Sequence, residues 1–314
     1  MSQHFKGYLY GCIAAVSYGV NPICAKYLYQ DGYNSNSVLF YRFLFGSVML
    51  GLFMLVQRKR FAITRREGKV LSLLGAVFAV SSLTYFLSFH YMSVGVAATL
   101  VFAYPVLTAM LMAFFFKERL KWPSLLAMLL TVGGIALLYK DDSGRAIALM
   151  GIVLILVSAL SYAIYIIVVN RSGIVMSSVK LTFYAMSSCL VCLTLYALLT
   201  PTGELQMLHT PMQWGMALTL GLVPTVISLV FMAMAIRCIG STPTAIMGAL
   251  EPVTAAVLGI MLFGEVMTLR IACGIMLILL SVIMIILDDK LRRALANVRV
   301  VRRGRLFIKK IRWR

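Results

Sequence analysis

Long apolar runs separated by short polar connections dominate the pattern of this 314-residue chain. A helix needs about 20 mostly apolar residues to cross a bilayer, and ten runs approach that length. Backbone polar groups in lipid must be satisfied within the segment itself, and the strand-length alternation of a membrane barrel is absent. The pattern therefore predicts an all-α integral membrane protein with ten transmembrane helices, at residues 7–28, 35–56, 70–91, 94–116, 122–140, 147–169, 178–199, 214–236, 242–263 and 269–287.

The charges of the connections predict how these helices are oriented. The second connection alone contains Arg58, Lys59, Arg60, Arg65, Arg66 and Lys69, whereas the odd-numbered connections contain only Lys140, Arg145 and Arg270. Short loops rich in lysine and arginine stay in the cytoplasm. We therefore expect a multi-pass protein of the plasma or inner membrane with both termini cytoplasmic.

The chain also repeats itself at a nearly constant offset. Residues 105–118 (PVLTAMLMAFFFKE) and 252–265 (PVTAAVLGIMLFGE) are identical at six of 14 positions, 147 residues apart. Residues 75–83 match 221–229 at five of nine positions, and Ser17-Tyr18 recurs as Ser161-Tyr162. We expect two five-helix repeats, at residues 1–144 and 145–287, followed by a cytoplasmic tail at 288–314. Because five is odd, the second repeat enters the membrane from the opposite side, and such inverted repeats are typical of secondary transporters.

The Pro-Val…Phe-x-Glu segment that closes the fourth helix of each half resembles the drug/metabolite transporter superfamily, specifically its EamA-domain family. The resemblance covers about residues 5–287. The glycine-glutamate step of this family is kept at Gly264-Glu265, whereas Lys117-Glu118 keeps only the glutamate. The resemblance implies a central cavity lined mainly by helices 1–4 and 6–9, with helices 5 and 10 peripheral. It also implies transport of small metabolites, often amino acids and commonly outward.

Composition agrees with a membrane protein and changes the interpretation of the charge. Hydrophobic residues make up 61% of the chain and charged residues only 12%, which excludes a soluble or a disordered chain. Of the net charge of +19, +9 lies in the tail, where basic residues alternate with apolar ones. We expect the tail to bind anionic lipid rather than nucleic acid. The clearest basic cluster comprises Arg302, Arg303, Arg305, Lys309 and Lys310.

Glu251 is the strongest candidate site residue. It lies near the middle of the ninth expected helix, directly before Pro252. A carboxylate at that depth must be protonated, paired or exposed to water, so Glu251 is a candidate for binding a substrate amine or a proton. An internal ion pair or hydrogen bond is the structural alternative. Tyr104 precedes Pro105 as Glu251 precedes Pro252, and it is expected to shape the same cavity.

Other polar residues in the spans are weaker candidates. Arg42 could bind a substrate carboxylate, pair with Glu251, or extend to the outer headgroups. The first helix offers Ser17, Tyr18 and Asn21, the sixth offers Tyr162, and the same residue types also cross-link helices. Prolines free a backbone carbonyl and break helices, so we expect breaks at Pro22, Pro105 and Pro252.

Missing motifs narrow the function. The chain has no phosphate-binding loop, no zinc-protease motif and no serine-hydrolase motif, so we expect no enzyme, no catalytic residue, no cofactor and no metal. The main hypothesis is a secondary transporter, in the outward direction, of a small metabolite such as an amino acid or related amine, with protons as a candidate coupling ion. The alternatives are a carrier of anionic metabolites such as nucleotide sugars or sugar phosphates, and a receptor or assembly protein that transports nothing. The oligomeric state stays open, with a homodimer as one alternative.

Overall fold

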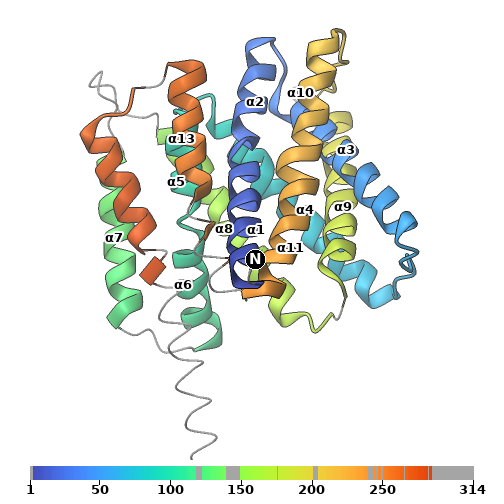
Figure 1. Ribbon diagram of the computed structural model, residues 1–314, viewed down its shortest axis with the longest axis horizontal. Helices are drawn as coiled ribbons and strands as arrows, with labels where there is room; N and C mark the ends of the chain where they lie inside the picture. The colour runs from blue at the N-terminus through green and yellow to red at the C-terminus, as the bar shows by residue number, and fades with distance from the viewer. Residues whose placement is uncertain are drawn as a thin grey trace, which may run out of the picture.

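A computed structural model describes residues 3–117, 122–138, 149–174, 176–200, 204–239, 244, 247–248, 250–264, 266–281 and 283–284. Every regular element in these ranges is a helix, as the apolar pattern predicts. The expected lipid-binding tail lies outside the described residues, as do Glu118 and Glu265. The helices lie side by side with most axes along one direction (Figure 1).

Several expected spans are single helices and others are divided. The undivided ones are α3 (Ser35–Val56), α4 (Arg65–Ser88), α7 (Trp122–Leu138), α8 (Leu149–Arg171) and α9 (Ser178–Leu199). The first span consists of α1 (Gln3–Gly19) and α2 (Asn21–Gln30), and the fourth of α5 (Val94–Val101) and α6 (Tyr104–Phe116). The eighth consists of α10 (Pro211–Gly221), η2 (Leu222–Ile227) and α11 (Ser228–Ile239), and α13 (Leu250–Phe263) falls in the ninth.

Six helical stretches are long and apolar enough to cross a membrane. They are Ser35–Val56, Arg65–Ser88, Val94–Phe116, Leu149–Val169, Ser178–Leu199 and Pro211–Met232. Shorter apolar helices occur at Leu125–Leu137, Leu250–Phe263 and Leu269–Ser281. Length and composition thus agree with a polytopic membrane protein, in which the remaining expected spans are short or interrupted.

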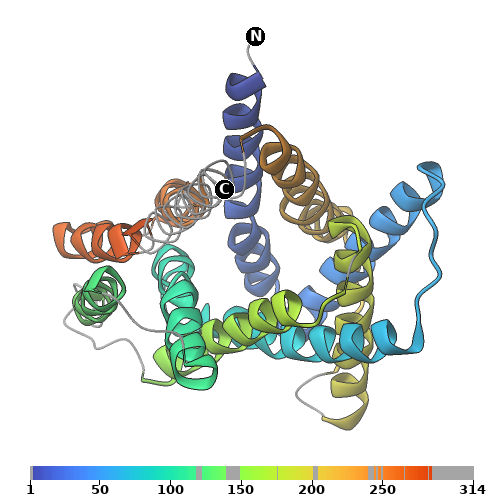
Figure 2. The ribbon, with the colours of Figure 1, turned by 90° about the horizontal axis from the view of Figure 1, so that it is seen from below.

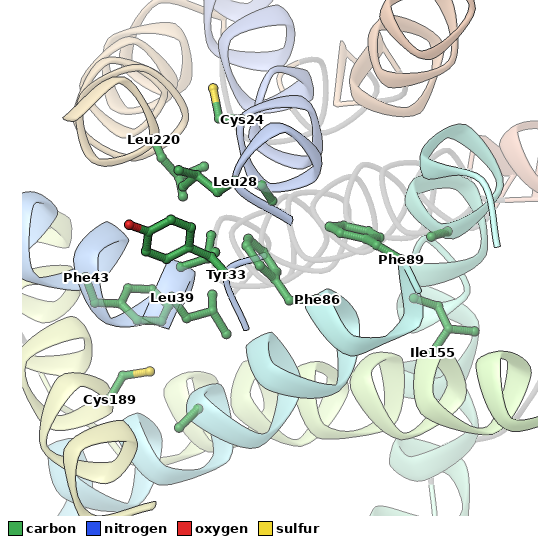
Figure 3. Packing of buried hydrophobic residues seen from close by; sticks show 14 of the residues in the cluster. Cys24, Leu28, Tyr33, Leu39, Phe43, Phe86, Phe89, Ile155, Cys189 and Leu220 are labelled. Atoms are coloured by element: carbon green, nitrogen blue, oxygen red, sulfur yellow. The ribbon is translucent and has the colours of Figure 1, made fainter. Parts of the chain in front are cut away.

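Residues far apart in the sequence form the core. α1 packs along α11, α4 packs along both α8 and α9, and α3 packs along α9. Seen from below, the helices are arranged around a common centre (Figure 2). Large side chains such as Leu39, Phe43 and Phe86 are fully buried between α3, α4 and their neighbours (Figure 3). The same cluster contains Ile155, Cys189 and Leu220 from the second half, so both halves of the sequence share one core.

α6 and α13 are both followed by a residue with a positive φ angle, which explains the glycine at position 264. Gly264 follows α13 with φ at +62°, and Lys117 follows α6 with φ at +54°. Both residues are in the left-handed conformation, which glycine adopts freely and which costs other residues about 1–2 kcal/mol. Lys117 therefore adopts the same left-handed conformation as Gly264, at some cost in stability.

Candidate functional site

Two helix breaks and one helix start meet near the centre of the molecule. Pro22 lies in the first turn of α2, Pro105 in the first turn of α6, and Pro252 in the first turn of α13. Proline is favoured there because its missing N–H would have no partner in the first turn. Tyr104 is the first residue of α6, and Glu251 is the second residue of α13. Both residues therefore lie where one helical segment begins and the chain can change direction.

A cavity of about 170 Å³ lies between these breaks. Its lining comes from α1 to α6, α8, α11 and α13, and none of it comes from α7 or α9 within the described residues. The family resemblance implied a contribution from the seventh helix, which the described part of α9 does not make. The polar and aromatic lining residues are Tyr18, Arg42, Phe78, Ser81, Ser82, Tyr85, Phe102, Tyr104, Ser158, Tyr162, Ser228 and Glu251.

Glu251 contributes the one carboxylate among the described lining residues. Within the described part of the chain, no group donates a hydrogen bond to this carboxylate or forms an ion pair with it. Gly19 helps to fix its position, because a Cβ added there would lie 2.6 Å from the Cβ of Thr254 and 2.9 Å from the Glu251 carbonyl oxygen. The end of α1 therefore packs directly against the start of α13 and holds Glu251 at the cavity wall.

Arg42 is buried, with 3% of its surface exposed, and its guanidinium is held by aromatic rings. The guanidinium carbon lies 5.8 Å from the ring centre of Tyr18, 5.4 Å from that of Phe43 and 5.7 Å from that of Phe86. The Nε–H donates to the Thr225 hydroxyl over 3.4 Å. Cation–π contacts of this kind stabilise a desolvated cation by about 2 kcal/mol. Arg42 therefore does not extend to the headgroups in this structure, and no ion pair with Glu251 forms between these two described residues.

Thr225, the hydrogen-bond acceptor of Arg42, belongs to an irregular segment that the apolar pattern did not predict. Thr225 lies in η2, a π-helical stretch of six residues that contains Pro224. Such π-helical insertions inside α-helices often occur at functional sites. The wider turn brings the Thr225 hydroxyl to Arg42, while the same hydroxyl donates to the Leu220 carbonyl over 3.3 Å.

Aromatic rings form much of the cavity wall. Tyr104 contacts Tyr162 edge to face with ring centres 4.8 Å apart, and Tyr104 also contacts Phe102 at 5.9 Å. Phe78 lies 6.4 Å from Tyr162. Tyrosine faces carry negative charge and attract cations. A carboxylate surrounded by such rings suits an ammonium group or another organic cation.

Residues at matching positions of the two expected repeats meet in this cavity. Tyr18 and Tyr162 both line it, and so do Tyr104 and Glu251. Ser82 and Ser228 form a third such pair, from the segments 75–83 and 221–229. Ser228 was not among the predicted site residues, although its position in the matched segments could have indicated it. Phe78, Phe102 and Ser158 were also missed, because apolar and serine positions are common in every span.

Two predicted site residues lie elsewhere. Ser17 is half-buried and Asn21 fully buried, and neither lines the cavity. Among the described residues, neither the amide nitrogen nor the amide oxygen of Asn21 has a hydrogen-bond partner. An amide buried without partners costs about 1–3 kcal/mol. Asn21 follows the break between α1 and α2, so it sits at a joint rather than on the cavity wall.

Serine hydroxyls in the cavity are largely used within the protein. Ser81 donates to the Ser158 carbonyl over 3.0 Å, and Ser158 donates back to the Ser81 carbonyl over 2.8 Å. Ser228 donates to the Ala14 carbonyl over 2.9 Å. These bonds join α4 to α8 and α11 to α1. The groups left to meet a ligand are therefore mainly the Glu251 carboxylate, the guanidinium of Arg42 and the aromatic rings.

Comparisons with known proteins agree with this architecture. The chain is 28% identical to the uncharacterized inner membrane transporter YicL of Salmonella typhimurium, over 94% of this chain and 100% of that protein. It is 25% identical to the uncharacterized transporter YcbK of Bacillus subtilis, over 85% of this chain and 89% of the relative. It is 27% identical to the S-adenosylmethionine uptake transporter of Rickettsia conorii, over 92% and 97% of the two chains.

A protein of known crystal structure shares the fold, with a TM-score of 0.64 and 18% identity. The alignment covers 92% of this chain and 98% of that one. The sequence model of the EamA-like transporter family matches residues 5–140 and again residues 149–287. Together these two matches span almost the whole chain apart from its tail, so this protein belongs to the EamA-like transporter family.

Proposed function

We propose that this protein is a secondary transporter of a small metabolite that carries an ammonium group, such as an amino acid or a related amine. The substrate binds in the central cavity with its cationic group at Glu251. Two five-helix repeats of opposite orientation expose the cavity alternately to the two sides of the membrane. The main support is the Glu251 carboxylate, which faces a cavity walled by aromatic rings. Among the described residues, this carboxylate has no hydrogen-bond donor and no ion-pair partner.

Charge balance supports an amine over an anion as the substrate. Leaving a carboxylate unpaired inside a membrane protein is costly, so such a group is expected to bind a cation or a proton during its working cycle. The described cavity also contains Arg42, whose charge is already stabilised by three rings and Thr225. Arg42 remains able to attract a carboxylate, so a zwitterion suits the site better than a nucleotide sugar or a sugar phosphate.

A methylated cation such as S-adenosylmethionine is a second candidate substrate. Its support is the aromatic lining by Tyr18, Tyr104 and Tyr162, together with the printed names of two Rickettsia relatives. Aromatic cages are a recurring solution for methylated cations, which form few hydrogen bonds. The size of the cavity favours the smaller solute, because ligands of drug size need about 300–1,000 Å³ and this cavity has about 170 Å³.

Direct transport by purified protein in proteoliposomes tests the proposal. Labelled amino acids, polyamines and S-adenosylmethionine would be offered separately, with and without an imposed pH gradient. We expect uptake of at least one amine and at least about a tenfold loss in Glu251→Gln, which keeps the shape and removes the charge. Glu204→Gln is the matched control, because Glu204 is exposed and, among the described residues, only its backbone carbonyl is hydrogen-bonded, accepting from Asn34 and Ser37.

The pattern of loss separates two roles for Glu251. If the carboxylate binds the substrate ammonium group, both net transport and substrate exchange fail in Glu251→Gln. If it carries only a proton, net transport driven by pH fails and exchange survives, because exchange needs no net proton movement. Wild-type net transport with an unchanged pH dependence in this variant would contradict both roles. Export and uptake are distinguished by loading the amine on each side of oriented vesicles.

A further inference from the structure

A second cavity lies at the end of the molecule where α2 and α4 end and α3 begins. Its volume is about 390 Å³, and its lining includes Tyr29, Ser35, Leu83, Leu87, His90 and Tyr196. It shares no described lining residue with the central cavity. The loop charges predict that this end of the protein faces the outside of the cell. We therefore call this space the outer cavity.

Helix α4 contributes to both cavities through adjacent faces. Phe78, Ser82 and Tyr85 line the central cavity, whereas Leu83 and Leu87 line the outer one, together with His90 just beyond the end of α4. Successive residues of a helix are rotated by about 100°. On that spacing, Phe86 falls between the two rows, on the strip of α4 that separates the cavities.

Phe86 contacts groups that belong to each side. Its ring is fully buried and lies 5.7 Å from the guanidinium carbon of Arg42 and 6.0 Å from the ring of Tyr85, both of which line the central cavity. Its backbone carbonyl accepts a hydrogen bond over 3.2 Å from Tyr29, which lines the outer cavity. Figure 3 shows Phe86 extending from α4 into the packed cluster beside Leu28 of α2.

The outer cavity has its own polar wall. The Tyr29 hydroxyl lies 2.9 Å from the Ser35 hydroxyl, and Ser35 lies 3.3 Å from Nε2 of His90. The rings of Tyr29 and His90 stack with centres 4.6 Å apart. The described lining contains no lysine, arginine or carboxylate side chain. The wall thus offers hydrogen bonds without the fixed charges of the central cavity.

We propose that the Phe86 side chain is the outer gate of the transport path and that the outer cavity is an external vestibule for the same small, amine-bearing solute. The inference rests on the proposed transport function. Hydroxyl and imidazole groups hydrate and briefly hold the solute, while tight binding belongs to the charged central cavity. Displacement of the Phe86 ring joins the two cavities, and its return separates them.

Thiol labelling tests the gate without requiring transport. In a variant free of native cysteines, Ser82→Cys reports on the central cavity and Leu87→Cys on the outer one. A membrane-impermeant methanethiosulfonate is added from outside to intact cells. We expect Leu87→Cys to react in every background, and Phe86→Ala to speed the labelling of Ser82→Cys by at least about tenfold, because the closed state loses its barrier.

Phe43→Ala is the matched control. Phe43 is equally buried and also lies near the Arg42 guanidinium, at 5.4 Å, but it belongs to α3 and not to the strip of α4 between the two cavities. Its removal should change the labelling rate of Ser82→Cys by less than about twofold. If Phe86→Ala does not insert, Phe86→Leu should give a smaller increase in the same direction. Equal rates in the Phe86 and Phe43 variants would overturn the gate, and labelling of Leu87→Cys only from inside would overturn the external vestibule.

The labelling result and the transport result are independent of each other. If Glu251→Gln transports normally while Phe86→Ala speeds the labelling of Ser82→Cys, the proposed role of Glu251 in binding is wrong and the proposed gate stands. If Glu251→Gln loses transport while Phe86→Ala leaves the labelling rate unchanged, the proposed binding role of Glu251 stands and the proposed gate is wrong.

Discussion

Tyr104 and Tyr162 meet edge to face, with ring centres 4.8 Å apart and ring planes at 88°. Tyr104 begins α6 and Tyr162 lies in α8, so the contact joins the two halves of the sequence at the cavity. In the expected repeats, their counterparts are Glu251 and Tyr18, which line the same cavity. The proposed binding site thus combines corresponding positions of the two expected repeats, with a carboxylate at only one of these positions.

The role of the Tyr104 ring can be separated from that of its hydroxyl. Tyr104→Phe keeps the ring contact and should retain transport affinity within about threefold, whereas Tyr104→Leu should lower affinity by about tenfold, because an aromatic contact contributes about 0.5–1.5 kcal/mol. Substrate concentration series in proteoliposomes measure both. Tyr165→Leu is the control, since Tyr165 stacks on Tyr162 at 5.8 Å without lining the cavity. A loss in Tyr104→Phe as large as in Tyr104→Leu would assign the effect to the hydroxyl instead.

Arg42 and Glu251 should be coupled only weakly, through the cavity that they share. Because the two described side chains line one cavity but form no ion pair, Arg42→Gln and Glu251→Gln should show a coupling energy for unfolding near the lower end of the roughly 0.5–3 kcal/mol range of coupled residues. Arg42→Lys should lose stability, since a lysine has no planar group to stack on several rings and no Nε–H for Thr225. Unfolding of the detergent-solubilised single and double variants gives these energies. Recovery of stability in the double variant would show that the two charges compensate each other.

The reciprocal bonds between Ser81 and Ser158 should stabilise the contact of α4 with α8. Each hydroxyl donates to the other residue's carbonyl, so Ser81→Ala and Ser158→Ala should each cost about 0.6 kcal/mol, the average for bonds between membrane helices. The double variant should cost about the sum. Thr84→Val is the control, because the Thr84 hydroxyl donates only to the Val80 and Ser81 carbonyls of its own helix among the described residues and not to α8. Thermal unfolding in detergent measures all four variants, and the idea fails if Thr84→Val costs as much as the serine variants.

Orientation in the membrane is open to a direct labelling experiment. In a background free of native cysteines, Gln30→Cys lies at the exposed end of α2 and Arg60→Cys in the connection before α4. From the loop charges, we expect an impermeant thiol reagent added outside intact cells to label Gln30→Cys and to leave Arg60→Cys unlabelled. Opening the membrane should expose both sites. The reverse pattern in intact cells would place both termini outside.

The sequence alone determined the class of the protein and the positions of its main helices. Spans such as 35–56 and 178–199 coincide with α3 and α9, because a length of apolar sequence that must satisfy its own backbone in lipid has few alternatives to a helix. The sequence also singled out Glu251 and Tyr104, since a carboxylate deep in a span and a repeated Pro-Val motif are local features. Family membership follows from the same features and is confirmed by the match over both halves.

Only the tertiary structure decided which polar residues share a space. Arg42, Tyr18 and Tyr162 line the cavity with Glu251, whereas Asn21 is buried at a helix joint although its sequence context is equally polar. The π-helical turn that brings Thr225 to Arg42, and the place of Phe86 between two cavities, also had no local signal. The physical reason is that the direction of each side chain depends on how the helices rotate and pack against one another, and packing depends on contacts between residues that lie far apart in the chain.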